Sequence, residues 1–172
     1  SEDFYHKLTG GHLAPVLETL VYLKQETDVW FELTTLLIPG ENDTDEELHE
    51  MSQWVVDNLG PDVPMHFTAF HPDWKMRDHP PTPHQTLRRA RRIALEHGVR
   101  YAYVGNVHDR KESSTWCHQC GGLLIQRDWY ELGAWHITAE GNCAFCGTPV
   151  AGRFEATPGQ WGSRRQPVRL AS

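Results

Sequence analysis

The sequence lacks several features that would place it in a common functional class. No apolar run reaches the ~18 residues that a membrane-spanning helix requires, and no signal peptide opens the chain. It contains no phosphate-binding loop, no G-x-S-x-G nucleophile motif and no H-E-x-x-H metal motif. The formal charge of −7 disfavours general binding to nucleic acids or anionic membranes, because both require a basic surface. We therefore expect neither nucleic acid nor membrane as a partner.

An initiator methionine is also missing, because the chain begins at Ser1 with an acidic stretch. We expect a piece of a longer protein. The 172 residues suffice for one domain with its own core and a small appendage. A change in composition near residue 112 predicts a domain over 1–111, a four-cysteine module over 112–151 and an extended basic tail over 152–172.

The most informative stretch is a strand followed by a helix. Residues 29–38 are apolar, β-branched and aromatic, and Pro39-Gly40 ends the run as a turn. Thr44 is the predicted N-cap of a helix, with Glu47 as its capping-box partner. The apolar positions of this helix recur every three or four residues as far as Leu59. A strand that is apolar on both faces and feeds an amphipathic helix is typical of a parallel sheet covered by helices.

The same unit is repeated in the rest of the first domain. Further helices are predicted over about 12–26 and 83–97, and further strands over 65–71 and 101–107. Thr82 precedes Pro83 and is the predicted N-cap of the later helix. The alternating order of helices and strands implies parallel crossovers. We therefore predict an α/β fold.

Four cysteines form two C-x2-C-G knuckles, separated by 22 residues. The knuckle cysteines are Cys117, Cys120, Cys143 and Cys146. Four thiolates leave no open coordination position on a tetrahedral ion, so the expected ligand is structural Zn²⁺ held by a small ribbon. An iron–sulfur cluster and a pair of redox dithiols are the alternatives. Paired cysteines of this kind are typical of a reducing compartment, so we expect the cytoplasm.

Three segments of the first domain carry a resemblance to a known family. These are residues 4–11 (FYHKLTGG), 16–18 (VLE) and 36–43 (LLIPGEND). In this order they resemble the later half of a radical S-adenosylmethionine enzyme of the branch that contains pyruvate-formate-lyase-activating enzyme. The chain is most similar to the radical enzyme of the AmmeMemoRadiSam system, which also ends in paired C-x2-C knuckles. The likeness covers residues 4–150.

The resemblance implies the C-terminal half of a partial (β/α) barrel. In that family a C-x3-C-x2-C loop binds a 4Fe–4S cluster, which reduces S-adenosylmethionine to yield a 5′-deoxyadenosyl radical. This sequence contains no C-x3-C-x2-C loop. The implied partners are thus the N-terminal half of a parent enzyme, S-adenosylmethionine, and a protein substrate or partner proteins of the AmmeMemo system. The chain alone is expected to be inactive.

The resemblance also implies five residues beside the cofactor. They are Thr34, Leu36, Ile38, Phe70 and His71. Relatives of the activating type often have arginine where Thr34 stands. Independently of the resemblance, His71 is the last residue of a predicted strand, at the carboxyl end where barrel folds build their sites. The alternative is a strand-end histidine that bonds a loop carbonyl.

Other site candidates depend on position alone. Glu32, Thr68 and Asn106 lie in or next to predicted strands, and Glu32 shares a strand face with Thr34 because side chains alternate. In a barrel that face can point inward. A different class of function is also open: a non-catalytic zinc-ribbon adaptor that binds a protein partner through exposed Trp and Arg residues. A C-x3-C-x2-C motif encoded upstream of Ser1 distinguishes the enzyme from the adaptor.

Overall fold

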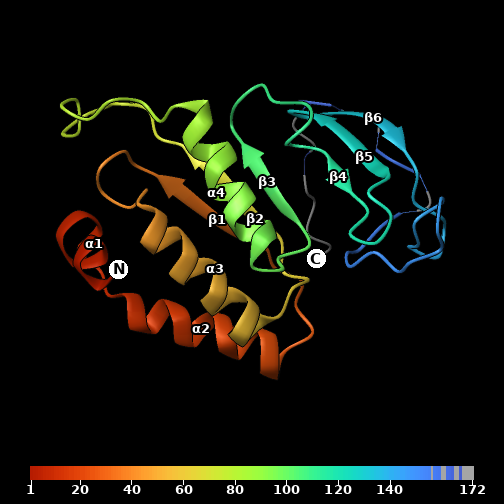
Figure 1. Ribbon diagram of the computed structural model, residues 1–172, viewed down its shortest axis with the longest axis horizontal. Coiled ribbons are helices and arrows are strands. Elements are labelled where there is room, and N and C mark those ends of the chain that lie inside the picture. Colours follow the sequence, from red (N-terminus) through yellow and green to blue (C-terminus); the bar gives the residue numbers. More distant parts are fainter. Residues whose placement is uncertain (156, 160–161, 165–166, 168–172) are drawn as a thin grey trace. The chain divides into compact units, whose positions relative to one another are not determined.

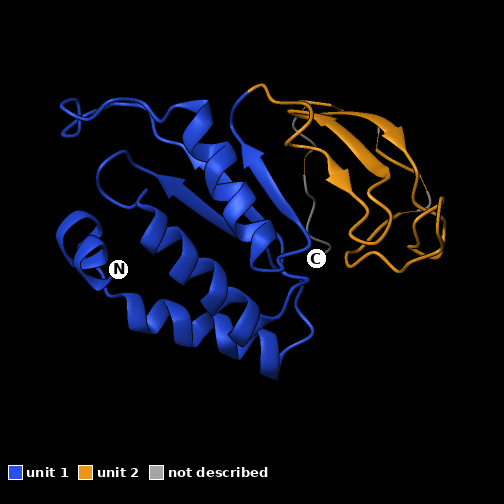
Figure 2. Cartoon of the chain, viewed as in Figure 1, with its two compact units in different colours: residues 1–107 blue, residues 108–172 orange. Residues whose placement is uncertain are grey.

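The computed structural model describes residues 1–155, 157–159, 162–164 and 167. The chain forms two compact units, residues 1–107 and 108–172 (Figure 2). The sequence prediction had placed this division at residue 111. The predicted basic tail includes Arg165 and Arg169, which lie outside the described residues. In the described ranges no helix is both long enough and apolar enough to cross a membrane.

The first unit is a three-stranded parallel sheet with helices on one face (Figure 1). Its elements are α1 (Glu2–Phe4), the π-helical turn η1 (Tyr5–Thr9), α2 (Leu13–Glu26), β1 (Leu33–Leu37), α3 (Asp45–Leu59), β2 (Met65–Ala69), α4 (His84–Glu96) and β3 (Ala102–Gly105). The strand order is β1-β2-β3. Leu33 is in register with Met65, and Met65 with Ala102. The predicted mixed α/β fold with parallel strands is therefore confirmed.

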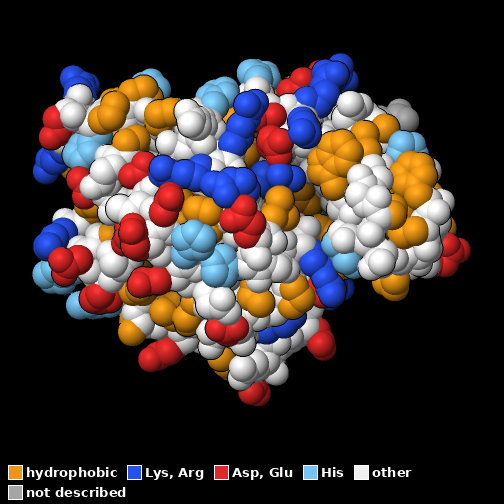
Figure 3. Space-filling model, in the orientation of Figure 1, with side chains coloured by type: hydrophobic (Ala, Val, Ile, Leu, Met, Phe, Trp, Pro, Cys, Tyr) orange, Lys and Arg blue, Asp and Glu red, His pale blue; other side chains and the backbone are white. Residues whose placement is uncertain are grey.

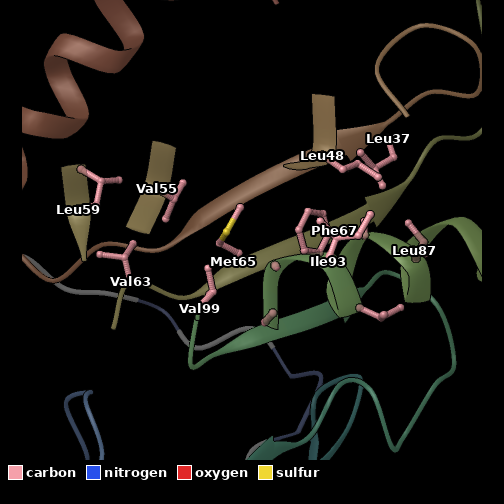
Figure 4. Close-up of a cluster of buried hydrophobic side chains, with 14 residues drawn as sticks. Leu37, Leu48, Val55, Leu59, Val63, Met65, Phe67, Leu87, Ile93 and Val99 are labelled. Atoms are coloured by element: carbon pink, nitrogen blue, oxygen red, sulfur yellow. The ribbon is translucent and has the colours of Figure 1, made fainter. Parts of the chain in front are cut away.

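Alternation along the strands explains which face the helices cover. Leu37, Met65, Phe67 and Val104 are fully buried and pack with the apolar stripes of α3 and α4 (Figure 4). The predicted face of α3 forms part of this core, because Leu48, Val55 and Leu59 are each at most 2% exposed. Helix α2 has no fully buried residue; its Leu20 and Val21 cover the core only in part.

Two helix N-termini differ in how they are capped. The Thr44 hydroxyl accepts a hydrogen bond from the N–H of Glu47 at 3.2 Å, as predicted for α3. At α4 the prediction was wrong, because the N-cap is Pro83 and Thr82 is not part of the cap. Thr82 is buried one residue earlier, and its hydroxyl bonds the ends of two strands, as described below.

Strand β1 is shorter than the apolar run that predicted it. The run begins at Val29, but the strand begins at Leu33. Val29 is 59% exposed and Trp30 is 37% exposed, so these residues do not belong to the core of the described unit. Apolar composition alone therefore overestimated the length of β1.

The second unit is an antiparallel ribbon. Its strands are β4 (Thr115–Trp116), β5 (Leu123–Asp128) and β6 (Glu131–Trp135), paired in the order β4-β5-β6. The sequence between the two knuckles predicts short strands over 122–126 and 130–138, which correspond to β5 and β6, whereas β4 was not predicted. Leu124, Ile125 and Ile137 form the buried interior of this small unit together with two of the cysteines.

Candidate metal centre and the carboxyl edge of the parallel sheet

The four knuckle cysteines come together in the second unit. Their sulfur atoms all lie within 4.8 Å of one another. The Sγ atoms of Cys117 and Cys146 are 3.7 Å apart, and those of Cys120 and Cys143 are 3.8 Å apart. Four Zn–S bonds of about 2.3 Å in a tetrahedron place the sulfurs about 3.8 Å apart. The group can therefore hold one metal ion.

The same backbone turn positions the thiols in both knuckles. The N–H of Gly121 donates to the carbonyl of Cys117, and the N–H of Gly147 donates to the carbonyl of Cys143, each at 2.9 Å. Both glycines have a positive φ, +70° and +75°, which other residues adopt only with strain. The glycine after each C-x2-C pair thus lets the chain turn back so that both thiols face the same point.

Burial differs within each knuckle. The first cysteines, Cys117 and Cys143, are 3% and 1% exposed, whereas Cys120 and Cys146 are exposed. Next to the second knuckle, the ring of His136 lies 4.9 Å from that of Phe145 between centroids. The Nδ1 atom of His136 is 2.8 Å from the carbonyl oxygen of Leu123, so this histidine supports the ribbon backbone.

Hydrogen bonds give the two exposed thiols opposite pKa shifts. The Thr148 hydroxyl and the Thr148 N–H stabilise the thiolate of Cys146 and lower its pKa to about 6. For Cys120 the N–H of Gly122 acts in the same direction, but burial and hydrogen bonds with the other three thiols outweigh it and raise the pKa to about 12. Four thiols this close cannot all ionise alone, and a bound cation removes that obstacle because it deprotonates coordinating thiols.

Four of the five predicted cofactor residues lie where strands β1 and β2 end, whereas Thr34 is the second residue of β1. Thr34 and Leu36 are exposed and alternate with more buried residues of β1, so both face away from the helices. Ile38 and Phe70 follow directly after adjacent strands and are buried, at 5% and 8% exposure. His71 is exposed just beyond β2. The structure brings Leu36, Ile38, Phe70 and His71 to one strand-end region but not Thr34, and the role of all five toward a cofactor stays a prediction.

The loop after β1 is organised by its own polar side chains. Asn42 accepts from the N–H of Ile38 at 2.7 Å and donates to the carbonyl of Leu36 at 2.9 Å. The carboxylate of Asp43 accepts from the N–H of Gly40 at 2.7 Å. These bonds satisfy backbone groups where the strand ends. Asn42 and Asp43, in the IPGEND motif (residues 38–43), thus have a structural task, which is to fix the conformation of the loop that follows β1.

Thr82 links the ends of both strands, a role that the sequence prediction missed. Its hydroxyl donates to the carbonyl of Leu37 at 2.5 Å and accepts from the N–H of Phe70 at 2.8 Å. The N–H of Thr82 in turn donates to the carbonyl of Phe70 at 3.1 Å. Thr82 is 6% exposed, so these bonds are shielded from water. A threonine before a proline resembles an N-cap in sequence, and no local signal distinguishes this long-range link.

His79 joins the two loops that follow β1 and β2. Its Nε2 atom is 2.8 Å from Oε1 of Glu41, and its Nδ1 atom is 3.0 Å from Oδ1 of Asp78. The Glu41 carboxylate and then the Asp78 carboxylate raise the pKa of His79 above its ordinary value. The ring also lies edge-on to Phe70, at 6.3 Å between centroids. This histidine was not predicted, because its loop carries no periodic pattern.

Asn106 has a structural role after β3. Its side-chain amide accepts from the N–H of Ala69 at 2.7 Å and donates to the carbonyl of Ala69 at 2.8 Å. Its φ of +48° is unusual for a residue other than glycine. The amide therefore completes the backbone pairing at the end of β2, next to Phe70.

Several polar side chains lie on the face of the parallel sheet that α3 and α4 do not cover. Glu32 and His66 are bonded at 2.6 Å, and the indole N–H of Trp30 donates to the other carboxylate oxygen at 3.1 Å. The ring of His66 stacks on Tyr103 at 5.0 Å between centroids. Thr34 is in register with His66 on this face. Polar side chains thus project from a sheet whose other face is an apolar core.

Comparison with known proteins yields one relative of unknown role. The protein named "Uncharacterized protein MJ0808" from Methanocaldococcus jannaschii is 40% identical over 149 residues, which is 86% of this chain and 44% of that protein. The chain therefore spans less than half of the relative's length. No family model matches the chain. No solved structure matches it either.

Proposed function

We propose that this chain is the C-terminal portion of a radical S-adenosylmethionine enzyme, a late part of a partial (β/α) barrel followed by a structural zinc ribbon. The observation that carries the proposal is the convergence of two sequence motifs. The IPGEND loop and the Phe70-His71 pair follow adjacent parallel strands, at the carboxyl end where barrel sites are built.

The sheet of the first unit supports the barrel interpretation. One face is covered by α3 and α4, while the other carries Glu32, Thr34 and His66. In a barrel the second face lines the interior. In the described part of the chain β1 pairs only with β2, which leaves its other edge for a preceding strand. The relative is more than twice as long as the matched segment, so it has room for additional strands.

In this proposal the chain supplies residues around the cofactor. Thr34, Leu36, Ile38, Phe70 and His71 bind S-adenosylmethionine, and the imidazole of His71 makes one hydrogen bond to it. The 4Fe–4S cluster, held by another part of the parent enzyme, supplies the electron that cleaves S-adenosylmethionine. Thr82 and Asn106 do not contact the cofactor in this proposal; their hydrogen bonds fix the ends of strands β1 and β2.

The test uses the full-length protein, reconstituted anaerobically with iron and sulfide. Production of 5′-deoxyadenosine from S-adenosylmethionine is expected, and its absence in a protein with a complete cluster would contradict the proposal. His71→Ala is expected to weaken cofactor binding several-fold, because one hydrogen bond contributes about 0.5–1.5 kcal/mol. His84→Ala, at the exposed start of α4, is the matched control and should bind like wild type.

For the four cysteines we propose Zn²⁺ as the resident ion. Sulfur separations of 3.7 and 3.8 Å suit a single tetrahedral ion. A four-iron cluster places each thiolate on a different iron, so its sulfurs lie farther apart. Metal analysis of anaerobically purified protein should give about one zinc per chain and little iron. Stoichiometric iron with sulfide would favour a cluster.

A second candidate function is a zinc-ribbon adaptor that binds a protein partner. The hairpin between β5 and β6 supports it, because Trp129 and Tyr130 at its turn are 47% and 65% exposed. Trp129 also has a φ of +54°, which is strained for a bulky residue. Exposed Trp and Tyr side chains are typical anchors of protein interfaces. If the gene encodes no C-x3-C-x2-C segment before Ser1, the adaptor is the better reading.

A further inference from the structure

Helices α3 and α4 of the first unit carry two histidines in direct contact, away from the strand ends described above. The Nδ1 atom of His49 lies 2.8 Å from the Nε2 atom of His97. The rings meet at 65° with centroids 5.0 Å apart. Both line an open surface hollow of about 480 Å³. On the face drawn in Figure 3, histidine side chains (pale blue) lie together where α3 and α4 meet.

A chain of hydrogen bonds fixes the proton positions of this pair. Gln53 donates its amide N–H to Asp57 at 2.8 Å, because a carboxylate can only accept. The amide oxygen of Gln53 must then accept from Nδ1–H of His97, at 3.0 Å. A neutral His97 therefore carries its proton on Nδ1 and presents the lone pair of Nε2 to His49.

This arrangement is the one that metal-binding histidines use. A ligating imidazole usually donates its second ring N–H to a carbonyl or carboxylate, which holds the tautomer and the ring orientation. Gln53 provides that contact for His97, and Asp57 in turn orients Gln53. The spacing of four residues between His49, Gln53 and Asp57 aligns them along one side of α3.

The separation of the two nitrogens also suits a shared ion. Two metal–nitrogen bonds of about 2.0–2.1 Å at a right angle place the nitrogens about 2.9 Å apart, whereas a tetrahedral angle places them about 3.3 Å apart. The observed 2.8 Å is the length of an N–H···N hydrogen bond between the two rings, so an ion that replaces this proton needs the nitrogens to separate by at most about 0.5 Å. Coordination through Nδ1 of His49 needs only a shift of its proton to Nε2, so no net proton is lost.

The surroundings favour a cation. The carboxylates of Glu50 and Asp57 line the same hollow. His97 is also the C-cap of α4, where the helix dipole places partial negative charge. We infer that His49 and His97 form a second metal site, for a divalent transition-metal ion that accepts imidazole nitrogen ligands, and that the bound ion joins α3 to the end of α4. This inference is independent of the proposed enzymatic function.

The experiment uses zinc-saturated protein, so that the cysteine site is filled, and titrates it with Ni²⁺ by calorimetry. One additional equivalent of Ni²⁺ should bind with zinc retained, as mass spectrometry of the native protein will check. His49→Ala and His97→Ala should each lower the affinity at least ten-fold. Gln53→Ala should lower it less, because it only orients His97. His84→Ala, at the other end of α4, is the matched control and should bind like wild type.

Two results would overturn the inference. One is the absence of any Ni²⁺ binding to zinc-saturated wild-type protein at millimolar concentration. The other is binding that His49→Ala and His97→Ala leave unchanged, which would place the ion at another histidine. The two substituted side chains are at the surface, so the variants are expected to fold, and circular dichroism checks this directly. Broadening of the His49 and His97 imidazole NMR signals by Ni²⁺ is a second, independent readout.

Discussion

Replacing Thr82 by valine tests whether one hydroxyl holds the strand ends of the parallel sheet. Valine keeps the shape but removes two buried hydrogen bonds, the 2.5 Å bond to the carbonyl of Leu37 and the 2.8 Å bond from the N–H of Phe70. Each such bond contributes about 0.5–1.5 kcal/mol, and a buried partner left unpaired costs about 1–3 kcal/mol. We expect Thr82→Val to lower the free energy of unfolding by about 2–3 kcal/mol. For a domain of about 100 residues this corresponds to a melting temperature lower by ~10 °C or more.

Urea unfolding followed by circular dichroism at 222 nm measures this change. All helices in the described ranges belong to the first unit, so the signal reports on that unit. The buffer contains saturating zinc to keep the second unit constant. Thr82→Ser keeps both bonds and should lose only about 1 kcal/mol, for the buried methyl group. Thr86→Val, in the first turn of the same helix, is the matched control. If Thr82→Val and Thr86→Val unfold within about 0.5 kcal/mol of each other, Thr82 does not act as the link described here.

Three further outcomes are expected. Removing the metal with a chelator should abolish the near-ultraviolet circular dichroism of Trp116 and Trp135 but leave the 222 nm signal of the first unit unchanged. Cys143→Ser should have the same effect. A near-ultraviolet signal that persists after complete metal loss would contradict a structural ion. The carboxylates of Glu41 and Asp78 raise the pKa of His79 in the folded protein above its ordinary value of 6.5. The contribution of His79 to the free energy of unfolding is therefore fully present below pH 6.5 and is lost as the pH rises through the raised pKa. Wild type should therefore lose more stability than His79→Gln between pH 5.5 and 8.5, and equal losses would exclude the ion pairs with Glu41 and Asp78 as a source of stability. Gly147→Ala should weaken zinc binding, because alanine strains a φ of +75° by about 1 kcal/mol, and a competition titration with a zinc chelator measures it.

Local patterns in the sequence were enough to predict helices α2, α3 and α4, the parallel sheet and a four-cysteine group that could hold a metal ion, but not α1 or η1. Helix α3 follows from its N-cap at Thr44 and the spacing of its apolar residues, and the cysteine group follows from two C-x2-C-G motifs. These features depend on residues a few positions apart, which sequence periodicity records directly.

The polar links across the fold could not be predicted in the same way. Thr82 bonds Leu37, 45 residues away, and His79 bonds Glu41, 38 residues away. Nothing in the spacing of these residues indicates such a partner, because it depends on which loops the folded sheet brings together. The start of β1 was also misplaced, since the apolar run begins at Val29, four residues before the strand that pairs with β2.

Because the knuckle cysteines are unequally buried, molecules in solution reach two of the four cysteines more easily than the other two. Each knuckle contributes one sulfur from the interior, on Cys117 or Cys143, and one at the surface, on Cys120 or Cys146. An incoming ion meets the surface pair first, and Cys146 offers the more acidic thiol of the two. A chelator or an oxidant in solution is therefore expected to reach Cys120 and Cys146 before it reaches Cys117 and Cys143.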